Sequence, residues 1–326
     1  MVTFDSYMEN ITSVAIAGHV KPDGDCVGSC LAVYNYLTGN YENVQIDLYL
    51  EPIPDKFQFL EHADKIQFPE ESDLEYDLFI ALDCGDLGRL GKASCYFEKA
   101  KSTVCVDHHI SNTNFADFNY IFPHASSTCE LVYELMDPEK MTKQIAECIY
   151  LGIVHDTGVF QYSCTSPKTM QVAGKLMEFG IDYPGIVDKT FFQKTYEQNR
   201  ILGKALKKSE LCMDGTCIYS VITKKEMEKY HVHPVDLDGI VSQLRSTEGV
   251  ETAIFLYQNE DDSYKVSMRS ASFVDVAAIA TEFGGGGHCR AAGATVSGKP
   301  EKILKKLLSR VKEQQKNHGE CLCTTE

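Results

Sequence analysis

Four short segments of the chain combine aspartate and histidine in patterns that suit metal-ion chemistry. They are HVKPDGDCVG (19–28), ALDCGD (81–86), VDHH (106–109) and GIVHDTG (152–158). Each segment alone is also typical of ordinary structure, since Pro, Asp and Gly form turns and strand ends are often polar. Carboxylates that gather in one place repel one another and raise their pKa values unless cations neutralise them. Four such segments in one half of the chain therefore indicate a cation site.

The donor atoms of these segments favour hard divalent cations. Carboxylate oxygens and imidazole nitrogens, without thiolate, suit Mn²⁺ or Mg²⁺ better than structural zinc. More carboxylates are present than one ion requires, so we expect a site for two cations. Cys26 and Cys84 are near these donors in the sequence, but we do not expect either to be a ligand. The candidate residues are His19, Asp23, Asp25, Asp83, Asp86, Asp107, His108, His109, His155 and Asp156.

Short apolar runs alternate with helical stretches up to about residue 160, which predicts an α/β fold with a mostly parallel sheet and helices on both faces. Strands are expected at 13–19, 44–50, 76–85 and 102–109. Ligands of an open parallel sheet bind beyond the carboxyl ends of its strands. Because several candidate residues follow directly after predicted strands, we expect them to meet at that edge.

Helices are expected between and after these strands, at 26–37, 128–136 and 145–158. The helix at 128–136 is preceded by Ser127, with Glu130 three residues further on. This spacing is typical of a capping box, in which the two side chains bond to each other's backbone N–H groups. It predicts the start of that helix.

The pattern of the sequence changes in its second half. Residues 189–208 are charged and helical in pattern, and we interpret them as a helix connecting two domains, 1–188 and 209–316. The second domain alternates β-rich runs with helices, which predicts a smaller mixed α/β fold. Its glycine run at 284–287 allows close approach of a ligand, and successive amides there can form an anion-binding nest. Residues 317–326 are interpreted as a disordered tail.

Composition excludes several classes of protein. The net charge of −16 argues against a general binder of duplex DNA, although metal ions can still attract short nucleotides locally. No apolar run approaches the roughly 20 residues that cross a bilayer, and the first residues do not resemble a secretory signal. Thirteen cysteines occur without a pairing rhythm, which favours reduced thiols. We therefore expect a soluble cytoplasmic protein without a membrane partner.

The four segments, in this order, resemble the motifs of the DHH phosphoesterases, and GGGGHCRAAG at 284–293 resembles the signature of the DHH-associated C-terminal domain. The pairing of these domains is similar to that of the NrnA-type enzymes of this family. Those enzymes hydrolyse very short RNAs and remove the 3′-phosphate of 3′-phosphoadenosine 5′-phosphate, and some relatives act on cyclic dinucleotides or their linear products. The resemblance implies an Mn²⁺-dependent phosphodiesterase and phosphomonoesterase in which two cations share an attacking hydroxide.

The resemblance also implies a role for most motif residues. The implied ligands are His19 and Asp23 for one Mn²⁺, Asp25, His108 and Asp156 for the other, and Asp83 as the bridge between them. His109 would face the scissile phosphate as a proton donor or charge stabiliser. Asp107 would orient its neighbours, a common task of an acid beside a metal-bound histidine. Asp86 and His155 receive no assignment, and Mg²⁺ or another divalent cation is an alternative to Mn²⁺.

In the second domain the resemblance implies a phosphate-binding surface that faces the metals across a cleft. Its candidate residues are Arg269, Gly285, Gly286, Gly287, His288 and Arg290. The expected substrates are nucleotides and RNA or DNA oligonucleotides of two to about five residues, including linear dinucleotides such as pApA. A homodimer is consistent with the resemblance, although no residue pattern requires it.

Three alternative functions stay open on the sequence alone. One is a manganese inorganic pyrophosphatase, although that enzyme would need a clamp rich in lysine and arginine where this chain is glycine-rich. The second is a cyclic-di-AMP phosphodiesterase, which differs from the leading hypothesis only in the shape of its substrate. The third is a nucleotide sensor without turnover, which would not require a complete set of metal ligands.

Overall fold

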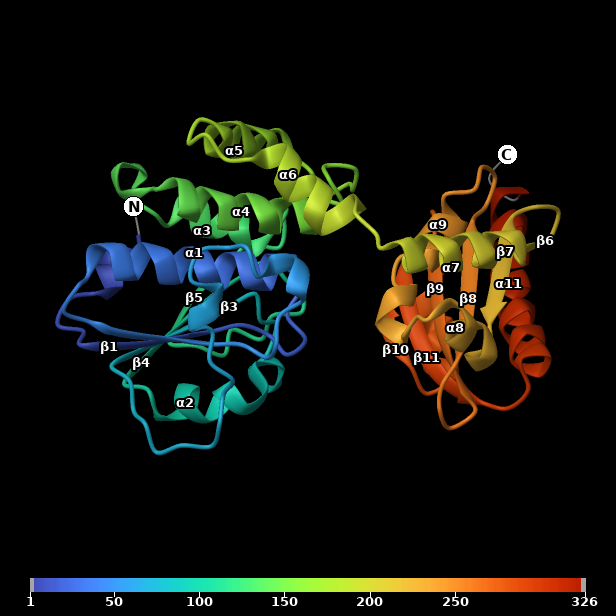
Figure 1. Ribbon diagram of the computed structural model, residues 1–326, viewed down its shortest axis with the longest axis horizontal. Helices are drawn as coiled ribbons and strands as arrows, with labels where there is room; N and C mark the ends of the chain where they lie inside the picture. The colour runs from blue at the N-terminus through green and yellow to red at the C-terminus, as the bar shows by residue number, and fades with distance from the viewer. Residues whose placement is uncertain (1–2, 324–326) are drawn as a thin grey trace. The chain divides into compact units, whose positions relative to one another are not determined.

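A computed structural model describes residues 3–323 of the 326-residue chain. The chain divides into two compact units, Met1–Gln193 and Lys194–Glu326 (Figure 1). Each unit has its own sheet and its own apolar core. Within the described residues, no helix combines the length and the apolar character that a membrane crossing requires.

The sheet of the first unit is fully parallel, with the strand order β2-β1-β3-β4-β5. Every residue of its central strand β3 is buried, as expected when helices cover both faces of a parallel sheet. The strands are β1 (Ser13–Ala17), β2 (Gln45–Tyr49), β3 (Leu78–Leu82), β4 (Ser102–Asp107) and β5 (Phe118–Ile121). Because all five run in the same direction, their carboxyl ends lie at one edge of the sheet.

Helices cover the two faces of this sheet unequally. Figure 1 shows α1, α3 and α4 on one face and α2 on the other. Side chains of β3 alternate accordingly, with Leu78, Ile80 and Leu82 in the larger apolar cluster and Phe79 and Ala81 in the smaller one. The helices are α1 (Gly24–Asn40), α2 (Ser94–Lys99), α3 (Thr128–Glu134), α4 (Lys143–Asp156), α5 (Pro167–Met177) and α6 (Tyr183–Val187). Shorter turns are η1 (Phe4–Tyr7), η2 (Asp55–Phe57), η3 (Ala63–Lys65), η4 (Leu87–Ala93), η5 (Pro138–Lys140) and the π-helical η6 (Asp188–Phe192).

The second unit has a mixed sheet with the order β10-β11-β9-β8-β7-β6, in which only β7 and β8 pair in parallel. Its strands are β6 (Glu210–Cys212), β7 (Cys217–Ile222), β8 (Thr252–Gln258), β9 (Ser263–Ser270), β10 (Gly286–His288) and β11 (Ala291–Ser297). Its helices are α7 (Tyr196–Lys207), α8 (Lys224–Tyr230), η7 (Pro234–Leu237), α9 (Ile240–Arg245), α10 (Val276–Glu282) and α11 (Pro300–Cys323). A parallel sheet covered by helices, followed by a smaller mixed domain, confirms the predicted fold class.

Three local features differ from the sequence-based expectation. The segment expected to be one connecting helix, 189–208, is interrupted between η6 and α7, and α7 belongs to the second compact unit. The expected tail from residue 317 continues α11 as far as Cys323, and the ring of His318 stacks on Phe273 at 4.0 Å between centroids. Residues 324–326 of that expected tail lie outside the described residues.

The start of α3 is also built differently from the expected capping box. The hydroxyl of Ser127 accepts a hydrogen bond from the N–H of Glu130, as predicted. The carboxylate of Glu130, however, accepts hydrogen bonds from the hydroxyls of Ser126 and Thr169. Burial of Glu130 beside these two hydroxyls draws its side chain away from the Ser127 backbone.

Close approach of α1 and α4 depends on glycine. A Cβ atom at Gly28 of α1 would lie 2.4 Å from the backbone oxygen of Cys148 and 3.1 Å from the N of Gly152, both in α4. Backbone atoms cannot rotate away as a side chain can, so any larger residue would force the two helices apart. These helices carry Asp25 and Asp156, so their spacing also sets the distance between those two side chains.

We expect Gly28→Ala to lower the free energy of unfolding by about 1–3 kcal/mol, the usual cost of overpacking a core. Urea denaturation followed by circular dichroism would measure it. Gly39→Ala in the same helix is the matched control, because a Cβ there has no neighbour within 4 Å. It should raise stability by roughly 0.5–1 kcal/mol through helix propensity. Equal stability of the Gly28→Ala variant and the wild type would contradict this account.

Candidate metal centre

The candidate donors come together beyond the carboxyl edge of the parallel sheet. Three of them follow strands, and the others come from the first turn of α1 and the last turn of α4. The positions are His19 after β1, Asp23 and Asp25 at the start of α1, Asp83 after β3, His108 after β4, and Asp156 at the end of α4. The structure thus gathers in one place all six residues that were implied as metal ligands.

His19 is held with one ring nitrogen toward the carboxylates. Its Nδ1 lies 2.9 Å from the backbone oxygen of Val20, which can only accept a hydrogen bond. In the neutral ring Nδ1 therefore carries the proton, and Nε2 is the free donor atom. Nε2 lies 3.5 Å from Oδ2 of Asp83 and 3.7 Å from Oδ1 of Asp23. This orientation suits coordination of a cation by His19.

His108 is oriented in the same way after β4, which is separated from β1 by β3. Its Nδ1 faces the backbone oxygen of Ala125 at 3.4 Å, which leaves Nε2 toward the acids. Nε2 lies 3.1 Å from Oδ2 of Asp156, 3.7 Å from Oδ1 of Asp83 and 3.9 Å from Oδ2 of Asp25. Asp25, His108 and Asp156 thus form a second group of donors, distinct from the one around His19.

Asp83 lies between the two groups and presents one carboxylate oxygen to each. Its Oδ2 faces His19, and its Oδ1 faces His108 and accepts a hydrogen bond from the hydroxyl of Thr128 at 2.9 Å. The backbone of Asp83 has φ 57°, a left-handed conformation that aspartate tolerates better than most residues. A carboxylate in this position can bridge two cations.

Asp25 is completely buried, and backbone amides compensate for part of its charge. Its two oxygens accept hydrogen bonds from the N–H of Thr128 at 2.7 Å and the N–H of Cys129 at 2.9 Å, in the first turn of α3. Burial, and then the nearby charges of Asp83 and Asp156, nevertheless raise the pKa of Asp25 well above its usual value. Further positive charge is therefore needed to keep this carboxylate ionised.

The negative charge of these acids raises the pKa values of His19 and His108. Burial lowers the pKa of His19, but hydrogen bonding to Asp23 and Asp83 outweighs burial and raises that pKa to about 12. Burial also lowers the pKa of His108, whereas its interactions with Asp156 and other acids raise it to about 10. Protons on the imidazoles supply the positive charge when no other cation is bound. Oxygen-rich donors that demand positive charge at two adjacent points fit a pair of divalent cations.

His109 lies beside the two groups with its Nδ1, 3.7 Å from Oδ1 of Asp83, toward them, and the hydrogen bond to Asp107 occupies that nitrogen. Its Nδ1 lies 2.7 Å from Oδ1 of Asp107 and must donate its proton there. Oδ2 of Asp107 accepts from the side-chain amide of Asn112 at 2.6 Å, so Asp107 is fixed from two sides. The hydrogen bond to Asp107 raises the pKa of His109 above its usual value. A fixed, readily protonated imidazole of this kind can donate a proton through Nε2.

Asp86 and His155, the two candidate residues without an assigned role, have hydrogen-bond partners away from the metal donors. Asp86 caps η4 by accepting a hydrogen bond from the N–H of Arg89 at 3.2 Å. His155 lies 3.0 Å from the hydroxyl of Thr190 through Nε2, and its ring packs against Phe57. Burial lowers the pKa of His155 to about 4, so this ring is neutral. Neither residue is placed with the metal donors.

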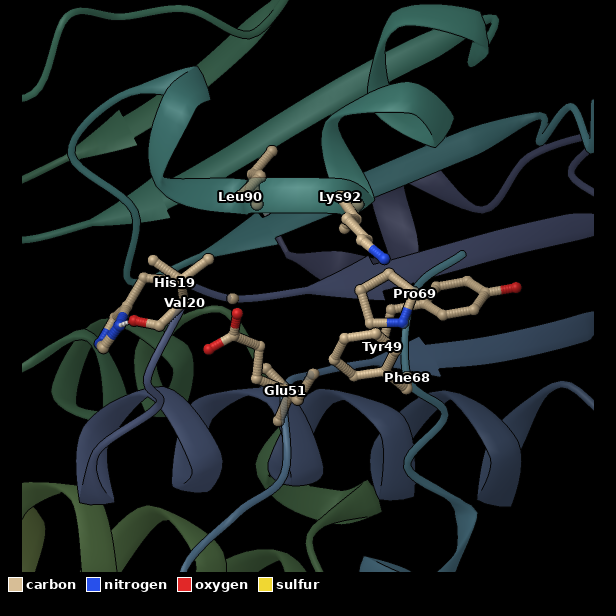
Figure 2. A pocket seen from close by; sticks show the side chains of 11 residues that line it. His19, Val20, Tyr49, Glu51, Phe68, Pro69, Leu90 and Lys92 are labelled. Carbon is tan, nitrogen blue, oxygen red and sulfur yellow. Dashed lines mark hydrogen bonds between the residues drawn. The ribbon is translucent and has the colours of Figure 1, made fainter. Parts of the chain in front are cut away.

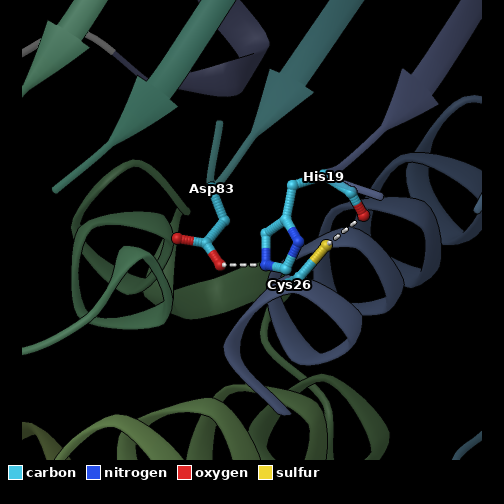
Figure 3. Close-up of side chains that lie close together, drawn as sticks. All are labelled: His19, Cys26 and Asp83. Carbon is cyan, nitrogen blue, oxygen red and sulfur yellow. Dashed lines mark hydrogen bonds and ion pairs between the residues drawn. The ribbon is translucent and has the colours of Figure 1, made fainter. Parts of the chain in front are cut away.

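Two residues near the site were missed in the sequence. Thr128 and Asn112 hold Asp83 and Asp107 through side-chain hydrogen bonds. A sequence signal existed for Thr128, since a helix start offers free N–H groups to a buried acid, whereas Asn112 had no signal of that kind. Cys26 was expected near the donors without being a ligand, and its Sγ lies within 4.8 Å of donor atoms of both His19 and Asp83 (Figure 3).

A pocket of about 340 Å³ adjoins His19 in the first unit (Figure 2). Its walls combine the aromatic ring of Phe68 with two charged side chains, Glu51 and Lys92. Nζ of Lys92 lies 5.3 Å from the centre of the Phe68 ring, and Glu51 accepts a hydrogen bond from the N–H of Lys21. The lining residues are Gly18, His19, Val20, Tyr49, Leu50, Glu51, Phe68, Pro69, Leu90, Lys92 and Ala93. A ligand bound at His19 would therefore have apolar and charged surface within reach.

In the second unit, two of the candidate substrate residues lie in one row of the sheet. Ala291 of β11 pairs with Arg269 of β9 on one side and with His288 of β10 on the other. The pairing places His288 and Arg269 two strands apart on the same face. Arg290 donates a hydrogen bond to the backbone oxygen of Val274 at 3.0 Å, and this contact stabilises the segment before α10.

Close packing of the backbone also explains why glycine occupies two of the positions expected to bind phosphate. A Cβ at Gly285 would lie 2.1 Å from the backbone oxygen of Gly293, and one at Gly287 would lie 2.5 Å from that of Ala291. Gly287 also has φ 143°. Close approach of β10 and β11 thus requires both glycines. Gly286 differs, because a Cβ there would meet no described atom within 4 Å.

Comparison with known proteins agrees with this architecture. Residues 13–153 match the DHH family, N-terminal domain, and residues 214–317 match the DHHA1 domain. The bifunctional oligoribonuclease and PAP phosphatase NrnA of Thermus thermophilus is 28% identical over 310 residues, which cover 94% of this chain and 91% of that protein. The protein of the same name from Bacillus subtilis is 28% identical over 315 residues, covering 93% and 96%. The crystal structure of an exopolyphosphatase-related protein from Bacteroides fragilis is similar with a TM-score of 0.88 at 26% identity, covering 95% and 94%.

We expect Thr128→Val to weaken the binding of Mn²⁺ by roughly 10-fold or more, because Asp83 would lose the hydroxyl that orients it. Thr128→Ser keeps the hydroxyl and should bind Mn²⁺ like the wild type. Both variants keep the backbone N–H that bonds to Asp25. Calorimetric titration with Mn²⁺ would measure the affinities, and circular dichroism would verify folding. Equal affinities of the valine and serine variants would show that this hydroxyl does not position Asp83.

Proposed function

Because the chain belongs to the DHH phosphoesterase family, we propose that it hydrolyses phosphoester bonds of very short oligonucleotides, including linear dinucleotides, and the 3′-phosphate of 3′-phosphoadenosine 5′-phosphate. Two Mn²⁺ ions are the proposed cofactors. The activities for which the relatives from Thermus thermophilus and Bacillus subtilis are named support this choice of substrates. The net charge of −16 favours small nucleotides over duplex DNA.

The observation that carries the proposal is the position of Asp83 between two groups of donors. One oxygen faces His19 and the other faces His108. Bound as a pair, the cations would supply a nucleophilic hydroxide at neutral pH and neutralise charge on the phosphoryl oxygens. The residues themselves set the spacing of the two positions, because Asp83 is fixed by its backbone and by Thr128.

His109 is the proposed proton donor to the leaving oxygen. Asp107 fixes its Nδ1–H, which leaves Nε2 as the nitrogen that can donate to a substrate, and the side chain is 33% exposed. The raised pKa of His109 favours the protonated ring that a general acid requires. Asp107 is buried and held by Asn112, so it acts by positioning His109 rather than by contacting substrate.

Arg269 and His288 are the proposed phosphate-binding groups of the second unit, with Gly286 as the glycine at which an added Cβ would meet no described atom within 4 Å. A guanidinium and an imidazole on one face of a sheet suit a nucleotide phosphate. The packing reasons found for Gly285, Gly287 and Arg290 make these three weaker candidates for direct contact.

We expect Asp83→Ala to lower turnover of pApA and of 3′-phosphoadenosine 5′-phosphate by at least roughly 10³-fold, because both cation positions lose a ligand. Asp86→Ala is the matched control, since Asp86 follows the same strand but only caps η4. Phosphate and mononucleotide release would be measured in Mn²⁺, with and without chelator. Full activity of a folded Asp83→Ala variant would refute the proposed site.

The same assay distinguishes the proposed function from its alternatives when pyrophosphate and cyclic di-AMP are included. The proposal requires faster turnover of linear dinucleotides than of either. Preferred release of phosphate from pyrophosphate would identify a pyrophosphatase. Tight binding of cyclic di-AMP without turnover of any nucleotide would identify a sensor.

We expect Arg269→Ala to raise KM for pApA by roughly 10-fold while Mn²⁺ affinity stays unchanged, because the loss would concern phosphate binding only. Arg310→Ala is a control in the same unit, where Arg310 pairs with Glu282 and Glu313 on the surface. Steady-state kinetics would separate KM from kcat. An unchanged KM would remove Arg269 from the substrate site.

A further inference from the structure

A buried thiol adjoins the first group of metal donors. His19, Cys26 and Asp83 offer one donor atom each, and these atoms all lie within 4.8 Å of one another. All three side chains are buried, with Cys26 fully inaccessible. Figure 3 shows the thiol on the side of His19 near its backbone oxygen, to which Sγ donates a hydrogen bond at 3.8 Å. The set of hard donors around His19 therefore has a soft donor next to it.

The fold makes room for this thiol. A Cβ at Gly18 would lie 2.3 Å from Sγ of Cys26 and 3.0 Å from Sγ of Cys30. Any other residue at Gly18 would displace the Cys26 side chain. Cys26 and Cys30 are one helical turn apart on α1, and both are fully buried. Only Cys26 belongs to the group of donors with His19 and Asp83.

Hard and soft cations prefer different donors of this set. Mn²⁺ and Mg²⁺ prefer carboxylate and imidazole, whereas thiolate selects Zn²⁺ and other soft cations. We propose that the His19 position has two modes of coordination: His19, Asp23 and Asp83 for a hard cation, and His19, Cys26 and Asp83 for a thiophilic cation such as Zn²⁺. This inference rests on the proposed metal site and adds a donor that the family resemblance does not assign.

The second mode would change both affinity and activity. On binding Zn²⁺ the thiol loses its proton to the buffer and forms a metal–sulfur bond, so Zn²⁺ would bind more tightly than Mn²⁺. In this second mode Cys26 would take the place of Asp23, whose side chain is 60% exposed, as the third donor. We therefore expect Zn²⁺ held in this way to support hydrolysis less well than Mn²⁺.

Co²⁺ is the probe for the metal–sulfur bond, because a thiolate ligand gives it a charge-transfer absorption that oxygen and nitrogen ligands do not give. Full-length wild type, Cys26→Ser and Cys30→Ser would be titrated with Co²⁺. We expect the sulfur band in the wild type and in Cys30→Ser, and its loss in Cys26→Ser. Cys30→Ser is the matched control, since it removes a buried thiol of the same helix without removing a donor.

Competition between Zn²⁺ and Mn²⁺ gives an independent measurement. Cys26→Ser should lose Zn²⁺ affinity by roughly 10-fold or more while its Mn²⁺ affinity remains within about 3-fold of the wild type. Cys26→Ala serves as a second variant, because alanine places no hydroxyl in the buried position and suits a helix. Circular dichroism would verify that each variant is folded.

The outcomes separate this inference from the proposed function. Binding of Mn²⁺ without any sulfur band for Co²⁺ in the wild type would overturn the role of Cys26 and leave the hard-cation site intact. A sulfur band that persists in Cys26→Ser and Cys26→Ala would overturn it as well. Failure of the folded wild type to bind Mn²⁺ at all would refute the proposed function itself.

Discussion

The concentration of negative charge beyond the first sheet is the constraint on which the rest of the structure depends. Asp25 and Asp83 are almost fully buried, and both lie within 4 Å of the same nitrogen of His108 as Asp156 does. Like charges repel strongly where water is excluded. Such a cluster is stable only when hydrogen-bond donors and cations face it, and the start of α3 supplies such donors.

Uncharged groups do much of this stabilisation. The first turn of α3 directs two amides at Asp25 and a hydroxyl at Asp83, and backbone oxygens orient both imidazoles. These contacts are made by protein atoms alone, so they would orient the candidate ligands whether or not an ion is bound. Preorganisation of this kind reduces the reorganisation that binding and catalysis would otherwise cost.

The parallel sheet and the meeting of the candidate donors at its edge could be predicted, because residue types and their order along the chain are visible in the sequence, and a β/α alternation brings strand ends to one edge. The partners of those donors could not. The helix start at Thr128 was visible in the sequence, but the acid that it meets was not, because the contact with Asp25 spans 103 positions of sequence. The short strand β5 was not predicted, because two of its four residues are exposed and its sequence shows no strong apolar alternation.

The glycine run illustrates a second limit of sequence reasoning. A GGGG segment is compatible with an anion nest and with close packing of two strands. Only the structure shows that Gly285 and Gly287 are needed for the close packing of β10 and β11. Cys26 illustrates a third, because its position beside His19 depends on the space left at Gly18. One sequence pattern can therefore have two physical explanations, and a contact in the structure can exist without any pattern in the sequence.

The order of the ligands along the chain has a consequence for synthesis. His19, Asp23 and Asp83 are translated well before Asp156, which completes the second group only after α4 has been made. A nascent chain therefore carries Asp25 through most of the translation of the first unit without the full set of donors around it. A cation that needs the second group could be bound only after that point, so it would stabilise the finished domain rather than template its early folding.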